Sequence, residues 1–250
     1  MDTVKETSRE ESNALADWLN SAISNHWMLV ITLSFGLYVG LPFLAPVFKQ
    51  LGLDGFANGI YFLYSFLCHQ YPQRSFFLFG QNSSYSLETI QLWQDTSNPL
   101  LLGRFIGNSQ LGWKVAWSDR MVSMFSSIPI IGWLWYPFRR KIKPLSIWGF
   151  LLFLVPMGLD GITHIISDFS GLGNGFRSTN TWLQILTGSA FPAEFYSGTQ
   201  LASFNSSMRL VTGVLFGIGV VWFFFPHLDI LFQKMKKYLE IKQDQISGVV

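Results

Sequence analysis

Apolar residues in this chain cluster into five long runs separated by polar connections. The runs cover residues 27–48, 51–67, 121–138, 145–164 and 209–226. A helix of roughly 20 apolar residues crosses the hydrocarbon core of a bilayer, which is roughly 30 Å thick. The second run is the shortest and contains Asp54. The pattern therefore predicts an all-α fold, a polytopic transmembrane helical bundle of about five spans.

The remaining segments divide the chain around a single transmembrane domain at 27–228. Residues 69–119 and 168–208 are predicted as external loops, and 229–250 as a cytoplasmic basic tail. Residues 1–26 form an acidic N-terminal leader, whereas a signal peptide needs a basic start. Within this leader, residues 10–24 suit a short interfacial helix. Its acids are Asp2, Glu6, Glu10, Glu11 and Asp17.

The basic residues predict the orientation. The connection between the third and fourth runs and the tail after the fifth are both basic, through Arg139, Arg140, Lys141 and Lys143, and through Lys234, Lys236, Lys237 and Lys242. Under the positive-inside rule both are cytoplasmic. Counting back through five spans places the N-terminus outside and the C-terminus inside. If the second run were a re-entrant hairpin, the N-terminus would lie inside and the acidic leader would be unexplained.

Composition supports a multi-pass protein of the plasma membrane. Hydrophobic residues make up 49% of the chain and charged residues only 13%, about half the usual charged share of a soluble domain. The net charge of +2 gives no indication of a nucleic-acid partner. The single cysteine excludes an intrachain disulfide, and no Cys/His spacing matches a zinc module.

Polar residues capable of chemistry lie at the ends of the apolar runs. In the predicted threading, four such clusters meet at the outer membrane face. They are Cys68-His69-Gln70, Asp119-Arg120, Asp160 with His164, and Asn205 with Arg209. The sequence therefore predicts one polar site at an external rim.

Three blocks of sequence resemble the bacterial and archaeal integral membrane family called domain of unknown function 2085. They are Cys-His-Gln-Tyr-Pro-Gln-Arg-Ser-Phe at 68–76, the block at 114–120 and the block at 160–164, within a resemblance over 37–225. The family usually has a second cysteine where this chain has Ser118, and glutamine where it has His164. The resemblance implies that no pairing of two cysteines is available here. Because the family has no established activity, it implies architecture and site location only.

Asp160 and His164 are the candidate catalytic pair. Their i, i+4 spacing puts them on one helix face, where a carboxylate can orient a histidine as a general base or metal ligand. The alternative is a structural pair at the end of the fourth span. If a metal is bound, His69 is the third candidate ligand; the sequence identifies no cofactor. Cys68 is either a thiolate nucleophile activated by a nearby arginine or a small buried hydrophobe.

Arginines at the rim suggest an anion site. Arg120 and Arg209 precede or begin helices, whose N-termini attract anions, and a guanidinium suits phosphate or carboxylate. The predicted binding residues are Arg74, Arg120, Arg209, Asn205, His69 and Gln70, with Arg177 as a further candidate. The alternative is an ion-pair network among Arg120, Asp119, Asp160 and Asp168 that locks the helix ends together.

Residues 180–188 and 205–213 share Asn, Thr and Gly in register. The second copy leads into the fifth span, whereas the first stops at Pro192, which breaks a helix. The pattern indicates either a local duplication that formed an external turn or lid, or a chance similarity.

Two functions remain from the sequence. The first is non-catalytic: binding of a membrane lipid, a cofactor or a partner subunit of a larger membrane complex at the outer-leaflet rim. The alternative is an enzyme acting on a lipid or anionic headgroup through the Asp160–His164 pair and the arginines. A transporter is disfavoured because repeated halves and broken core helices are missing from the pattern.

Overall fold

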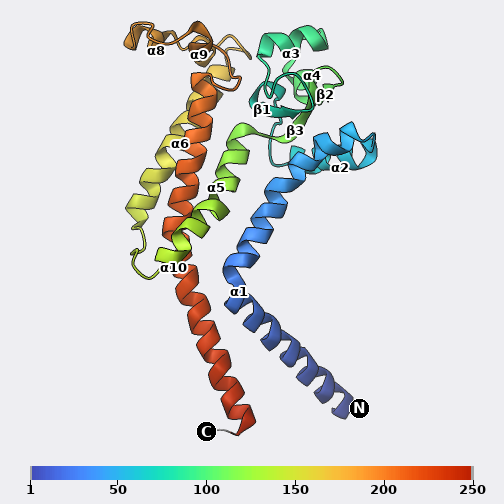
Figure 1. The fold of residues 1–250 in the computed structure, drawn as a ribbon, viewed down its shortest axis with the longest axis vertical. Helices are drawn as coiled ribbons and strands as arrows, with labels where there is room; N and C mark the ends of the chain where they lie inside the picture. Colours follow the sequence, from blue (N-terminus) through green and yellow to red (C-terminus); the bar gives the residue numbers. More distant parts are fainter. Residues whose placement is uncertain (1, 249–250) are drawn as a thin grey trace.

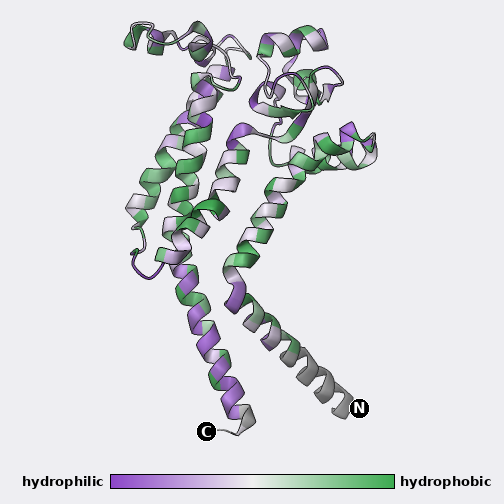
Figure 2. Ribbon diagram, in the orientation of Figure 1, coloured by the Kyte–Doolittle hydropathy of each residue, from purple (hydrophilic) through white to green (hydrophobic). Residues whose placement is uncertain are grey.

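The structure, a computed structural model, describes the backbone of residues 2–248 and the side chains of residues 15–245. Figure 1 shows long helices side by side in the middle of an elongated molecule. A small head of short helices and strands lies at one end, and two helix extensions project at the other. The hydropathy colouring in Figure 2 places apolar residues along the middle and polar residues along the extension of the last helix.

Four helices in the described residues are long and apolar enough to cross a membrane. They are α1 (Asp2–Gln50), α5 (Asp119–Trp135, followed by the 3-10 turn η2 at Tyr136–Phe138), α6 (Ile147–Asp168) and α10 (Phe204–Ser247). Helix α10 packs against α5 and α6, and α1 packs against α5 and α10. The predicted multi-pass helical membrane architecture is confirmed.

The predicted count of five spans is wrong, because residues 51–67 do not form a spanning helix. Helix α2 (Asp54–Ser65) has 12 residues, so it is about 18 Å long and too short for the hydrocarbon core. With four spans, both chain ends lie at the same end of the molecule (Figure 1). The predicted placement of the N-terminus opposite the C-terminus is therefore also corrected.

The predicted leader is the first part of α1. A kink at His26 (φ −124°, ψ 25°) separates it from the spanning part that begins at Trp27. Asp17 in this part forms an ion pair with Lys242 of α10, so the leader approaches the basic tail. Proximity to basic residues thus accounts for an acid in the leader without an external N-terminus. The side chains of Asp2, Glu6, Glu10 and Glu11 lie outside those described, as do residues 249–250 of the tail.

The predicted external loop at 69–119 folds into the head and contains a sheet that the sequence pattern did not predict. Strands β1 (Ser75–Leu78), β2 (Gly107–Asn108) and β3 (Gly112–Ser118) are antiparallel in the order β1-β3-β2. The 3-10 turn η1 (Pro72–Arg74) precedes β1, and helices α3 (Leu87–Gln94) and α4 (Pro99–Arg104) complete the head. Its core includes Phe77, Tyr85, Ile90, Leu102 and Leu111.

Strand β3 joins the head to the membrane helices. Trp117 is fully buried, and its ring contacts Tyr38 of α1, Tyr64 of α2 and Phe125 of α5. The strand runs directly into α5. This packing fixes the position of the first turn of α5 relative to the end of α1.

The connection between α6 and α10 contains three short helices, α7 (Phe176–Thr179), α8 (Thr181–Leu186) and α9 (Ala193–Tyr196). Figure 1 shows α8 and α9 beside the ends of α6 and α10, at the same end of the molecule as the head. At that end of the molecule, α5, α6 and α10 therefore lie between this connection and the head.

Candidate functional site

The starts of α5 and α10 are joined by a buried ion pair. Arg209 donates from Nε to Oδ1 and from Nη2 to Oδ2 of Asp119, both over 2.7 Å. Ser206 donates a further hydrogen bond to Oδ2. Ser203 caps α10 by accepting from the backbone N–H of Ser206, and Asp119 lies in the first turn of α5, where the helix dipole favours a carboxylate.

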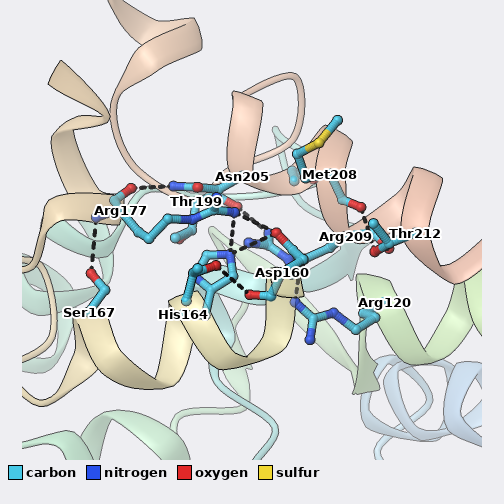
Figure 3. A network of polar contacts seen from close by, with 12 residues as sticks. Arg120, Asp160, His164, Ser167, Arg177, Thr199, Asn205, Met208, Arg209 and Thr212 are labelled. Atoms are coloured by element: carbon cyan, nitrogen blue, oxygen red, sulfur yellow. Dashed lines mark hydrogen bonds and ion pairs between the residues drawn. The ribbon is translucent and has the colours of Figure 1, made fainter. Parts of the chain in front are cut away.

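Asp160 of α6 is held by two arginines from different elements. Arg120 Nη2 lies 2.5 Å from Oδ2, and Arg177 Nη2 lies 2.5 Å from Oδ1. Figure 3 shows both guanidinium groups converging on this carboxylate. The carboxylate is buried, so the arginines neutralise a charge that would otherwise be costly to bury.

His164 is adjacent to Asp160 but does not form a hydrogen bond with it. Its Nε2 lies 3.8 Å from Asp160 Oδ1 and 3.2 Å from Arg177 Nη2. A guanidinium has only donors, so we assign Nε2 as the acceptor of a neutral imidazole that carries its proton on Nδ1. The lone pair that a general base would use at Nε2 is therefore occupied by Arg177.

Arg74 connects the head to the end of α6. Its Nη2 lies 2.8 Å and 3.0 Å from the two carboxylate oxygens of Asp168. Arg74 ends the 3-10 turn that precedes β1, so this pair positions the first strand beside the membrane helix.

Several of these side chains line a cavity of about 580 Å³, within the range of small-molecule sites. Three arginines line it, Arg74, Arg120 and Arg209, with Asp168 as the one carboxylate among its described lining residues. Apolar residues form another part of the wall: Leu67, Met121, Ile165 and Phe169. Within the described chain, Arg74 Nε, Arg120 Nε and Arg209 Nη1 have no hydrogen-bond partner. The cavity wall thus combines guanidinium groups, each paired with an aspartate, with apolar side chains.

The structure brings most of the predicted clusters to this cavity. Cys68, His69 and Gln70 line it together with Arg120, His164 and Arg209. The His69 ring stacks on Tyr71 with centroids 5.9 Å apart. Among the described residues, no group of three His, Cys, Asp or Glu is placed to hold a metal ion. The suggested metal triad of His69, Asp160 and His164 is therefore not assembled.

Two predicted binding residues have their side chains engaged within the protein. Gln70 is buried and donates from Nε2 to the Tyr61 carbonyl over 2.8 Å. Asn205 is fully buried, and its amide donates to the carbonyls of Arg177 (2.5 Å) and Gly198 (2.6 Å). The amide nitrogens of these two side chains are bonded to backbone carbonyls, so the two residues shape the site and do not offer those nitrogens to a ligand.

The sequence pattern did not identify Lys114 as a site residue, although it lies in the second family-like block. This fully buried lysine donates from Nζ to the carbonyls of Gln70 (2.7 Å) and Gly103 (2.9 Å). Burial lowers the pKa of Lys114 to about 7, against a smaller opposing effect of Cys68. The sequence feature that could have identified Lys114 is its position as a charged residue next to the apolar residues 115–117. Lys114 fixes the Gln70 turn at the edge of the cavity.

Arg177 is a more central residue than the sequence indicated. Its backbone N–H donates to Ser167 Oγ over 3.0 Å, and its carbonyl accepts from the amides of both Asn180 and Asn205. Its guanidinium lies over the Phe204 ring at 5.3 Å. Burial lowers the pKa of Arg177, and Asp160 opposes this effect. Arg177 thus ties the 176–201 connection to α6 and α10.

The fold and this site define a multi-pass helical membrane protein with a polar cavity at the helix ends of one membrane face. The family model described as "Predicted membrane protein (DUF2085)" matches residues 109–195, which include β3, α5, α6 and Arg177. The expected resemblance to this family is confirmed over that range, which does not reach the 68–76 block.

An uncharacterized protein of the archaeon Methanocaldococcus jannaschii is 25% identical over 219 residues, which cover 84% of this chain and 98% of that protein. No solved structure matches this chain. Neither description states an activity, so the function rests on the geometry of the site.

Proposed function

We propose that this membrane protein binds the anionic headgroup of a phosphate-bearing lipid in the cavity at its outer helix ends. The observation that carries the proposal is the composition of the cavity wall. Arg74, Arg120 and Arg209 line it against one carboxylate, Asp168, and apolar residues complete it. The binding is non-catalytic, and the ligand comes from the outer leaflet.

The charges favour an anion. Asp119 and Asp160 pair with these arginines but do not line the cavity. The three lining arginines therefore face the cavity against a single acid. Each guanidinium has five N–H donors in a planar fork that matches the oxygens of a phosphate, and one nitrogen of each arginine has no hydrogen-bond partner in the described chain.

The apolar part of the wall favours a lipid over a free anion. Ile165 and Phe169 belong to the outer end of α6 and its cap, and both side chains are exposed, as is that of Leu67. Exposed apolar residues at the end of a membrane helix face acyl chains. A headgroup in the cavity would therefore leave its chains beside these residues in the bilayer.

Binding is favoured over chemistry by the position of His164. Arg177 occupies its Nε2, and Asp160 Oδ1 lies 3.8 Å from that atom, so the pair does not form the oriented dyad that a general base needs. A catalytic role for Asp160 and His164 stays a prediction, as does a partner subunit.

The test uses the purified full chain in native mass spectrometry, titrated with phosphatidylglycerol or phosphatidylcholine of identical chains. We expect preferential retention of phosphatidylglycerol. Arg74→Gln should weaken it roughly 10-fold to 100-fold, the effect of one charged hydrogen-bonding group of about 1.5–3 kcal/mol. Asp168→Asn should strengthen it, because the variant removes the carboxylate from the cavity wall. Arg104→Gln, which makes the same charge change at an exposed residue of the head, is the matched control.

A further arm separates the lipid from a free anion. Inorganic phosphate at millimolar concentration competes with phosphatidylglycerol if the cavity recognises the anion alone, and leaves retention unchanged if the acyl chains contribute. Equal retention of the two lipids, or the same response in Arg74→Gln and Arg104→Gln, would overturn the proposal.

A further inference from the structure

Helix α2 presents an apolar surface that no other part of the described chain covers. Asp54 is the one charged residue between 50 and 68, and it pairs with Lys49 over 2.7 Å at the beginning of the helix. Phe56, Phe62 and Phe66 are exposed by 68%, 67% and 73%. The Phe62 and Phe66 rings contact each other edge to face, with centroids 5.0 Å apart.

The inward face of α2 is fixed by its tyrosines. Ala57, Tyr61 and Tyr64 are buried at helical spacing. The Tyr61 hydroxyl donates to the Lys114 carbonyl over 2.5 Å, and the Tyr64 hydroxyl donates to the Tyr38 carbonyl over 2.7 Å. Both hydroxyls are bonded inside the protein, and the exposed phenylalanines and leucine of α2 lie on the opposite face. The two tyrosine hydrogen bonds therefore fix the rotation of α2 about its axis, with its apolar face turned outward.

The outward face of α2 continues the lipid-facing surface of a membrane helix. Exposed apolar residues of α1 include Leu37 and Leu44, and they are followed by exposed Leu51, Leu53 and Phe56 across the turn into α2. Only three residues separate the end of α1 at Gln50 from the start of α2. Since α1 ends at a membrane surface, α2 begins at that surface.

We infer that α2 is an interfacial helix embedded in the outer leaflet, with its phenylalanine face covered by lipid. Helices that lie in the membrane plane bury an apolar face at the boundary between headgroups and acyl chains. An exposed cluster of large apolar side chains is uncommon on a soluble surface. The length of α2 suits lying on a bilayer and not crossing it.

The position of α2 has a consequence for the cavity. The chain leaves α2 through Leu67, Cys68 and His69, which line the cavity. An embedded α2 would therefore hold the cavity at the level of the lipid headgroups. The inference itself does not depend on what the cavity binds.

Spin-label accessibility in lipid vesicles tests the inference. Cys68→Ser removes the one native cysteine, and a nitroxide is then attached at Phe62→Cys or Phe66→Cys. Leu92→Cys on α3 is the matched control, because Leu92 is an apolar residue of the head exposed by 83%. If Phe62→Cys or Phe66→Cys does not insert into the membrane, Phe56→Cys is used in its place.

At positions 62 and 66 we expect collisions with dissolved oxygen, which concentrates in lipid, to exceed collisions with a water-soluble nickel chelate. At position 92 the order should be reversed. Nickel-dominated collisions at positions 62 and 66 would show a water-exposed helix and overturn the inference. Protection from both reagents would show that protein, such as a second copy of the chain, covers this face, and would overturn it as well. Neither result depends on the lipid preference of the cavity.

Discussion

Arg209 and Asp119 join the start of α10 to the start of α5 through two parallel hydrogen bonds of 2.7 Å each. Both side chains are buried. Arg209 also donates from Nη2 to the Thr199 carbonyl over 2.7 Å. The pair therefore holds two membrane helices and the connection before α10 in one arrangement at the edge of the cavity.

Removing one member of this pair should be strongly destabilising, because the other charge would remain buried without a partner. We expect Asp119→Asn to lower the free energy of unfolding by about 3–5 kcal/mol. Asp54→Asn, which breaks the pair that the exposed Asp54 forms with Lys49, should cost about 0–1 kcal/mol. Unfolding of the detergent-solubilised protein, followed by circular dichroism, measures both. Equal losses would contradict a special role for the buried pair.

The two asparagines that match between residues 180–188 and 205–213 donate to the same backbone atom. Asn180 and Asn205 both donate their amide N–H to the Arg177 carbonyl, over 2.9 Å and 2.5 Å. Thr187 and Thr212, which also match between the two segments, each donate to the carbonyl four residues earlier. The two copies thus make matching contacts, whatever their origin.

This shared acceptor predicts a more than additive effect. Either Asn180→Ala or Asn205→Ala leaves the Arg177 carbonyl with one donor, whereas the double variant leaves it without either. Each single variant should cost about 1–3 kcal/mol. The double variant should exceed their sum by about 1 kcal/mol. A double-variant cycle of unfolding free energies measures the coupling, and strict additivity would show that the two bonds act independently.

That the predicted polar residues meet at one cavity was predictable, because it depends on where the apolar runs end. Three helix ends and the segment after α2 bring His69, Arg120, His164 and Arg209 to one cavity. The number of spans, in contrast, could not be predicted from hydropathy. Residues 51–67 are as apolar as a short span, but the tyrosines at 61 and 64 bond to the head and α1, contacts that hydropathy does not contain.

Long-range pairings account for the other differences. The sheet forms by pairing Ser75 with Ser118 and Phe77 with Lys114, across about forty residues of chain. Arg177 reaches Asp160 because the chain after α6 turns back on itself. Neither feature has a local sequence period, so the pattern of apolar and polar residues does not indicate it.

Lys114 predicts a pH dependence of stability. Burial lowers its pKa in the folded protein to about 7 from an unfolded value of 10.5. Between these values the unfolded chain binds more protons than the folded one, so stability should rise with pH from about 7 to 10. The slope should approach 1.4 kcal/mol per pH unit at most. Unfolding free energies at pH 7, 8 and 9 measure it. Lys114→Met should be less stable throughout and should lose this slope, so a slope retained in Lys114→Met would assign it to another group.

The four-span architecture predicts that both chain ends are cytoplasmic. In a Cys68→Ser background, single cysteines at Asn20, Ser97 and Lys141 report on the first part of α1, the head and the α5–α6 connection. We expect an impermeant maleimide to label position 97 in intact cells, and to label positions 20 and 141 only after permeabilisation. The basic connection sets this orientation, and an even number of spans puts position 20 on the same side as position 141. Labelling of position 20 in intact cells, with position 141 still protected, would require an odd number of spans and would restore residues 51–67 as a crossing segment.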